Sequence, residues 1–254
     1  PIGGSLEFAR LFEKKYKETD GKIRFNSKVE KILTDGNEVS GLELKNGEDI
    51  NDAHIVISAA DGYSTIYKML EGKFLNKKIE KLYLSNPLWP SVVMVLLGIR
   101  RSLENEYSNY DIRLEKEFII DEKSKTNNVS ATIYNFDPTL APESKTVIRV
   151  ILHTHNFEYW NTLRQCNSKK YKAEKERISN EIIDILEERI GNIKQYVEEV
   201  DVSTPATMYR YTGNFKGSIQ GWQWLPGLIP KHIKPTLPRL KNFYMAGQWV
   251  MPGG

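Results

Sequence analysis

The chain has 254 residues, of which 40% are hydrophobic and 27% are charged, and its formal net charge is +3. This composition is typical of a globular protein with one large or two small domains. The small net charge argues against a nucleic-acid surface, and no apolar run approaches the ~20 residues that span a bilayer. A single cysteine, Cys166, excludes an internal disulfide and fits a reducing compartment. No signal peptide is visible, so we expect a cytoplasmic protein.

The first 60 residues change from a helical to a strand periodicity. Apolar residues recur at helical spacing from Ser5, the expected N-cap, to a stop near Asp20-Gly21. Strands are predicted at 22–26, 29–33 and 39–44, with turns at 35–37 and 45–47, which together make a small β-meander. The run 54–60 is apolar on both faces, which is typical of a central strand in a sheet covered on both sides.

The middle of the chain predicts a second body with its own core. Helices are expected at 63–70, 75–84 and 170–190, and strands at 91–97, 118–120, 129–134 and 146–153. The long helix carries a buried stripe of Ile178, Ile182, Ile185 and Leu186, and Gly191 caps it. We therefore predict an antiparallel, mixed sheet with helices on one face, from which residues 204–211 return to the first body.

The end of the chain predicts a short buried strand, 242–246, followed by a glycine-rich turn. Gly247 allows a close approach of the backbone, and Pro252-Gly253-Gly254 predicts a turn. Such a strand and turn usually open a helix whose N-terminus faces a phosphate or another polar group. We expect no helix after it here, and the sequence contains no Gly-x-Gly-x-x-Gly. The site that this motif builds is expected to be incomplete in this chain.

Other residues with reactive side chains have simpler explanations. His153 and His155 share one face of a strand, but no third ligand supports a metal site. Asp137 precedes Pro138 and is expected to set a turn rather than to act as a catalytic carboxylate. No acid/base pair stands out, so the catalytic residues stay unassigned.

Four motifs in a fixed order carry a resemblance to a known family. They are Pro1-Ile-Gly-Gly-Ser5, the pair 27–32 and 56–60, the loop Phe136-Asp-Pro-Thr-Leu-Ala-Pro142, and Gly247-Gln-Trp-Val-Met-Pro-Gly-Gly254. In this order the chain resembles the flavin amine oxidase superfamily, and within it the phytoene desaturase and carotenoid isomerase branch. The resemblance spans the whole chain but only the later half of the family's sequence.

The resemblance implies FAD as the cofactor of the full-length protein. The positions that match the family's cofactor contacts are Val29, Ala59, Ala60, Gly247, Gln248, Gly253 and Gly254. Many members have an acid at the position of Gln248, where glutamine keeps the hydrogen bond and loses the charge. We expect the full-length protein to bind FAD and this chain alone not to bind it, because the Gly-x-Gly-x-x-Gly unit is absent from it.

The resemblance also implies a polyene or other lipid-like substrate. Desaturation would move a hydride to the flavin, whereas isomerisation would use reduced flavin without net redox change. Tyr209, Tyr211, Trp222 and Trp224 either line an apolar tunnel or pack in a core. Two alternatives stay open: an amine oxidase of the same superfamily, and a non-catalytic module that binds an apolar ligand.

The expected fold class is α+β, with α/β character in part. A partial FAD-binding domain at 1–62 is followed by a substrate-binding domain at 63–212, and residues 213–254 return to the FAD-binding domain. The sequence leaves the oligomeric state open, together with peripheral membrane contact through an amphipathic or aromatic patch.

Overall fold

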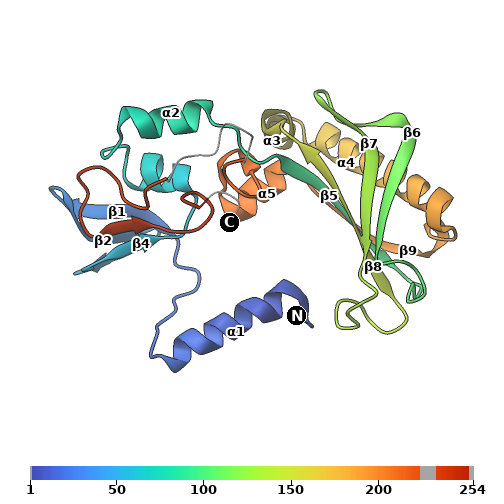
Figure 1. The fold of residues 1–254 in the computed structure, drawn as a ribbon, viewed down its shortest axis with the longest axis horizontal. Coiled ribbons are helices and arrows are strands. Elements are labelled where there is room, and N and C mark those ends of the chain that lie inside the picture. Colours follow the sequence, from blue (N-terminus) through green and yellow to red (C-terminus); the bar gives the residue numbers. More distant parts are fainter. Residues whose placement is uncertain (1, 224–232, 252–254) are drawn as a thin grey trace. The chain divides into compact units, whose positions relative to one another are not determined.

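The computed structural model describes residues 2–223 and 233–251 (Figure 1). They form two compact units, each built from two stretches of the chain. The first unit combines Pro1–Ile23 with Ser91–Ala206, and the second combines Arg24–Pro90 with Thr207–Gly254. The expected mixture of helices and antiparallel sheet is confirmed.

A five-stranded antiparallel sheet organises the first unit, with strand order β6-β7-β8-β5-β9. Its elements are α1 (Gly4–Glu18), β5 (Ser91–Ile99), β6 (Asn109–Asp121), β7 (Ser124–Ile133), β8 (Thr146–Thr154), α3 (Phe157–Cys166), α4 (Ser168–Ile190), η2 (Lys194–Tyr196) and β9 (Val197–Ser203). The long predicted helix and the strands at 91–97, 129–134 and 146–153 are confirmed, whereas α3 and β9 were not predicted.

Helices α3 and α4 cover one face of this sheet (Figure 1). The predicted stripe of α4 supplies Ile178, Ile182 and Leu186, which are fully buried. They pack with alternate residues of the central strands, such as Val95 and Val150, which are also fully buried. Strand alternation and helix periodicity thus direct apolar side chains into one core.

Asp121, at the end of β6, is a buried carboxylate that joins several elements of the first unit. It accepts hydrogen bonds from the Thr154 hydroxyl at 2.6 Å, the Asn156 amide at 3.2 Å and the Trp160 indole at 3.1 Å. Because each donor comes from β8 or from α3 and its entry, this carboxylate fixes the start of α3 against the sheet.

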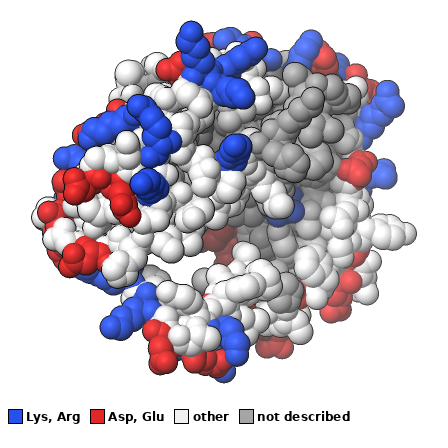
Figure 2. Space-filling view, turned by 60° about the vertical axis from the view of Figure 1, so that its left-hand side comes forward, with Lys and Arg blue, Asp and Glu red and all other residues white. Residues whose placement is uncertain are grey.

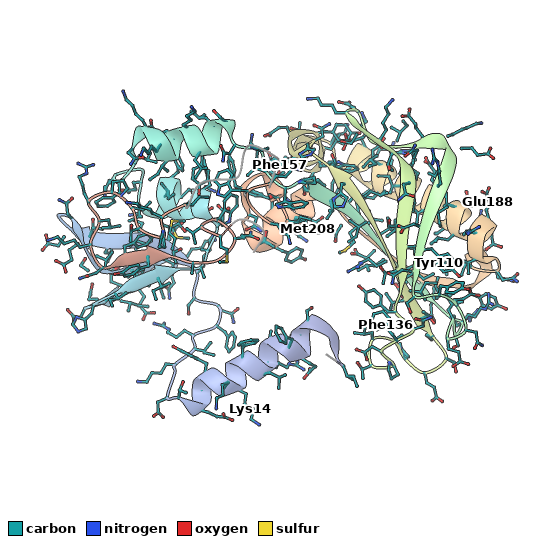
Figure 3. All side chains as sticks on the ribbon, in the orientation of Figure 1. Lys14, Tyr110, Phe136, Phe157, Glu188 and Met208 are labelled. Atoms are coloured by element: carbon teal, nitrogen blue, oxygen red, sulfur yellow. The ribbon has the colours of Figure 1, made fainter. Side chains whose placement is uncertain are left out.

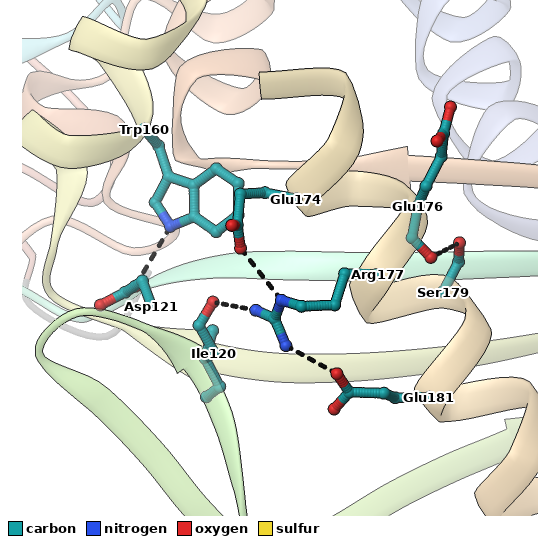
Figure 4. Close-up of polar contacts among 8 residues, drawn as sticks. All are labelled: Ile120, Asp121, Trp160, Glu174, Glu176, Arg177, Ser179 and Glu181. Atoms are coloured by element: carbon teal, nitrogen blue, oxygen red, sulfur yellow. Dashed lines mark hydrogen bonds and ion pairs between the residues drawn. The ribbon is translucent and has the colours of Figure 1, made fainter. Parts of the chain in front are cut away.

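Arg177 ties α4 to the same strand (Figure 4). Its guanidinium donates to Glu174 at 3.1 Å and to Glu181 at 3.0 Å, and a third contact reaches the carbonyl of Ile120 at 3.5 Å. Two carboxylates therefore compensate one half-exposed cation, which is the usual arrangement for a charge that is partly removed from water.

Helix α1 begins at Gly4, with Gly3 rather than Ser5 at its N-cap. None of its residues is buried, and Leu6, Phe8, Leu11 and Phe12 are exposed. The Gly3 N–H donates to the Asp137 carboxylate at 2.8 Å.

The turn interpretation of Asp137 is confirmed. Its carboxylate also accepts from the Thr139 hydroxyl and N–H, and these hydrogen bonds lower its pKa. The neighbouring Phe136 is exposed in the same loop, where Figure 3 labels it.

The second unit contains two small sheets. Its elements are β1 (Val29–Asp35), β2 (Glu38–Leu44), β3 (Asp49–Asn51), β4 (Val56–Ser58), the π-helix η1 (Ser64–Met69), α2 (Lys77–Ser85), α5 (Pro205–Thr212), which begins in the first unit, η3 (Phe215–Gly217) and β10 (Phe243–Met245). Strands β1, β2 and β3 form the predicted meander, and β4 pairs with β10 in parallel.

The structure corrects two strand predictions, one of them only in part. Residues 22–26 form no strand, because Phe25 finds no apolar partner and stays 66% exposed. The run 54–60 is a strand only at Val56–Ser58, and Ile55 and Ile57 are 59% and 66% exposed. Among the described residues β4 is therefore covered on one face, whereas coverage on both was expected.

Residues 63–90 pack with the second unit rather than with the sheet of the first. Ile66, Leu70 and Phe74 join Phe243 and Trp249 in a second core. The predicted substrate-binding domain, 63–212, includes this segment. The division into cofactor and substrate domains stays a prediction.

Lysine and arginine side chains are interspersed with acidic ones over the face seen in Figure 2. No helix in the described ranges 2–223 and 233–251 has both the length and the apolar composition to cross a membrane.

Candidate functional site

The carboxyl ends of β4 and β10 lie at the same edge of their two-stranded sheet. Ser58 lies opposite Met245, and the Ala246 N–H donates to the Ser58 carbonyl at 2.9 Å. Because the strands are parallel, the residues that follow them emerge together. Four predicted site residues come from these two ends, namely Ala59, Ala60, Gly247 and Gln248.

Gly247 starts a tight turn after β10. Its φ is +85°, a conformation that favours glycine, and a side chain there would meet no atom within 4 Å. The Gly247 carbonyl accepts from the Val250 N–H at 3.1 Å and the Met251 N–H at 3.0 Å. A hydrogen-bonded turn therefore follows the strand, as the glycine turn chemistry predicted. The backbone at Gly247 is open to an approaching group.

Asp61 was missed by the sequence analysis, although it directly follows Ala60. Its side chain is buried and accepts from the N–H groups of Ser64 at 2.7 Å and Phe215 at 2.8 Å. Burial raises the pKa of this carboxyl despite these hydrogen bonds. Asp61 thus starts η1 and anchors the loop that precedes η3. The Asp-Gly pair after an apolar run was the available signal.

Gly62 packs beneath a cluster of aromatic rings. A Cβ at this position would lie 2.3 Å from the Tyr83 hydroxyl oxygen and 3.0 Å from Trp249. The Tyr83 ring lies edge to face with Trp222, with centroids 4.9 Å apart. Burial, and then the charge of Asp61, raise the pKa of the Tyr83 hydroxyl. The cluster holds the strand end and the Gly247 turn together, because Trp249 belongs to that turn.

The aromatic residues predicted to line the substrate site lie in different surroundings. Trp222 is fully buried, and its indole donates to the Trp249 carbonyl at 3.1 Å, which favours core packing. Tyr209 is half-buried and its hydroxyl accepts from Lys68 at 3.3 Å, whereas Tyr211 is 76% exposed. Their contact with a substrate stays a prediction.

The other predicted positions are Val29, Trp224, Gly253 and Gly254. Val29 is half-buried at the start of β1, where it pairs with Leu44 in the meander. Trp224, Gly253 and Gly254 lie outside the described residues.

An apolar cavity of about 370 Å³ lies in the second unit beside the Gly247 turn. Its lining includes Met245, Trp249 and Val250 from the end of β10 and the turn, and Ile79 and Leu82 from α2. The indole Nε1 of Trp249 has no hydrogen-bond partner among the described residues. A cavity of this size and character suits part of a small apolar ligand.

The described part of the chain holds no cluster of three or more His, Cys, Asp or Glu side chains arranged as metal ligands. His153 and His155 are both exposed, and the pKa of His153 is lowered by partial burial and by its neighbour.

Comparison with known families gives the class of this protein. All of residues 1–254 match the flavin containing amine oxidoreductase family. The chain belongs to this family, as the ordered motifs indicated.

Individual relatives within the family are carotenoid isomerases and desaturases. The chain is 26% identical to a prolycopene isomerase, chloroplastic, from Daucus carota, with 100% of this chain and 41% of the relative aligned. It is 22% identical to a 4,4'-diapophytoene desaturase from Methylomonas sp, with 99% and 49% aligned. The chain thus spans less than half the length of these relatives, and its resemblance to carotenoid isomerases and desaturases is confirmed.

A solved structure shares the fold. An oxidoreductase from Methanosarcina mazei superposes with a TM-score of 0.62 over 98% of this chain and 50% of its own, at 16% identity.

Proposed function

We propose that the full-length protein is an FAD-dependent oxidoreductase that acts on a polyene or similar lipid-like substrate. The observation that carries the proposal is the parallel pair β4 and β10, whose ends bring Ala59, Ala60, Gly247 and Gln248 to one edge. Family membership supports flavin as the cofactor. The names of the carotenoid isomerase and desaturase relatives support the substrate class.

The residues at this edge fit a flavin nucleotide. Ala59 and Ala60 are small and exposed, and Gly247 leaves its backbone uncovered, so these three positions present no bulky side chain to a large cofactor. Gln248 is half-buried and offers a neutral amide for a hydrogen bond. When bound, FAD supplies the electron-transfer chemistry, while the protein supplies position and a dry pocket. Asp61 and the Tyr83 cluster keep the two strand ends in place.

The apolar cavity beside Gly247 favours a hydrophobic ligand over a polar amine. Its lining is dominated by aliphatic and aromatic side chains, and the aromatic rings nearby pack edge to face. Among the described residues this lining contains no carboxylate that could pair with a protonated amine. Cytoplasmic location and contact with a membrane surface stay predictions.

Flavin binding by the full-length protein tests the proposal. We expect the purified protein to be yellow and to release FAD on denaturation, whereas the 254-residue chain alone purifies colourless. Gln248→Ala should weaken FAD binding roughly twofold to tenfold, the range for one neutral hydrogen bond. The exposed Gln220 provides the matched control, since Gln220→Ala leaves the affinity unchanged.

Two results would overturn this proposal. One is a folded, colourless full-length protein without affinity for added FAD. The other is a flavoprotein whose FAD affinity is the same for Gln248→Ala and Gln220→Ala. That result would mean that FAD does not bind at this edge.

A further inference from the structure

The face of the five-stranded sheet opposite α3 and α4 carries an uncompensated positive charge. Arg149 lies on this face, in the middle of the central strand β8. Its guanidinium Nε is buried and has no hydrogen-bond partner among the described residues. A donor left without a partner costs free energy, so it requires an explanation.

The contacts that Arg149 does make are weak. Its Nη2 reaches the Thr132 hydroxyl only at 3.4 Å, and its guanidinium carbon lies 5.4 Å from the centre of the Tyr134 ring. No carboxylate within the described ranges lies within 4.0 Å of it. In the same unit, Arg177 has two carboxylates, so pairing is available to a cation in this fold.

Glu199 and Asp201 of β9 and Asp111 of β6 share this face two strands away, and among the described residues none of them forms an ion pair with Arg149. Asp201 of β9 is separated from it by Leu96, which pairs with both residues. Two strand spacings correspond to roughly 9–10 Å. Asp201 and Asp111 already accept hydrogen bonds from the hydroxyls of Ser203 and Ser130. The missing counter-charge is therefore not supplied by this sheet.

Apolar side chains flank Arg149 on the β5 side of this face, whereas Thr132 of β7 lies directly opposite it on the other side. Leu96 lies directly opposite it on β5, and Ile151, two residues along β8, lies opposite Met94. All three are half-buried, so they form an apolar strip beside the guanidinium. A guanidinium is suited to a planar oxyanion, because two of its N–H groups can bind both oxygens of a carboxylate.

We propose that this sheet face binds an amphiphilic carboxylate, such as a long-chain fatty or polyenoic acid. Arg149 pairs with the carboxylate, and the hydrocarbon chain lies along Leu96, Met94 and Ile151. A small rotation of the guanidinium presents Nε–H to the second oxygen. This site lies in the first unit and is additional to the proposed flavin edge in the second. It does not depend on flavin being bound.

The test compares an acid with its neutral ester on the full-length protein. The probe is cis-parinaric acid, whose fluorescence rises on binding, and its methyl ester. We expect wild-type protein to bind the acid roughly tenfold to hundredfold more tightly than the ester, the range for a charge-assisted hydrogen bond. Arg149→Met should abolish this preference while leaving ester binding unchanged.

Arg113→Met is the matched control, because Arg113 is an exposed cation on the edge strand β6 of the same sheet. It should retain the preference for the acid. Arg149→Lys keeps the positive charge but loses the paired N–H groups of the guanidinium. This variant should retain only part of the preference for the acid. Circular dichroism verifies the fold of each variant, and Arg149→Lys decides the question if Arg149→Met does not fold.

Equal binding of acid and ester by wild-type protein would overturn the inference. So would a folded Arg149→Met, or failing that Arg149→Lys, with undiminished preference for the acid. The assay does not depend on a flavin signal. A protein that binds no FAD but prefers the acid would therefore contradict the proposed function and still support this inference.

Discussion

The two units build their cores from different material. In the first, burial repeats at regular intervals along long strands and along a 23-residue helix. The buried residues of the sheet and of the helix then pack against each other. In the second, strands of three to seven residues are held by loops, aromatic rings and a buried aspartate. The first core depends on periodic apolar burial, whereas the second depends on a few close contacts between particular side chains.

The largest effect is expected for the first core. Trp160→Ala removes a fully buried indole and one donor to Asp121, so the free energy of unfolding should fall by about 3–5 kcal/mol. Ile57→Ala, at a 66% exposed position of β4, should change it by less than ~0.5 kcal/mol. Urea denaturation followed by circular dichroism measures both. Similar losses for the two variants would contradict the difference between the units.

A smaller effect is expected where the second unit has no room. Gly62→Ala places a methyl group against the Tyr83 hydroxyl and Trp249, which should cost about 1–3 kcal/mol of unfolding free energy. Removing the hydroxyl should restore part of it, so the double variant Gly62→Ala/Tyr83→Phe is expected to be more stable than Gly62→Ala. A double-mutant cycle gives the coupling. Strictly additive losses would show that this close contact does not limit the site.

The same difference explains how much could be predicted. The stripe of α4 and the alternation of β8 follow from periodicity, because each repeats the pattern several times. The prediction of a strand at 22–26 is wrong because the segment alternates polar and apolar residues, but Phe25 has no apolar surface to pack against. Ala59, Ala60, Gly247 and Gln248 were found through family motifs, and the parallel pairing then placed them together.

Other features depend on contacts that the sequence does not show. Asp61 and Tyr83 were not predicted, because the residues that surround them come from distant segments of the chain, such as Phe215 and Trp249. Arg149 escaped because a missing partner leaves no trace in a sequence. Only the positions of its neighbours show that the charge is uncompensated.

The smallest predicted effect concerns pH and Asp61. Because its folded-state pKa is raised, the native state holds a proton more tightly than the unfolded state. The stability from this group is therefore greatest at pH values below the ordinary aspartate pKa of ~3.9, and it is lost as the pH rises through the folded value. Asp61→Asn removes this dependence, so the unfolding free energy of the wild type relative to the variant should fall across that window.

A constant offset accompanies this change, because an asparagine carbonyl replaces only one of the two oxygens that accept from Ser64 and Phe215. The pH slope, and not the offset, is thus the informative quantity, and urea midpoints at several pH values supply it. Asp52→Asn alters an exposed aspartate of the same unit and should reproduce the wild-type slope. A wild-type slope in Asp61→Asn would mean that the pKa of Asp61 is the same in the folded and the unfolded protein, so that its two N–H donors balance its burial.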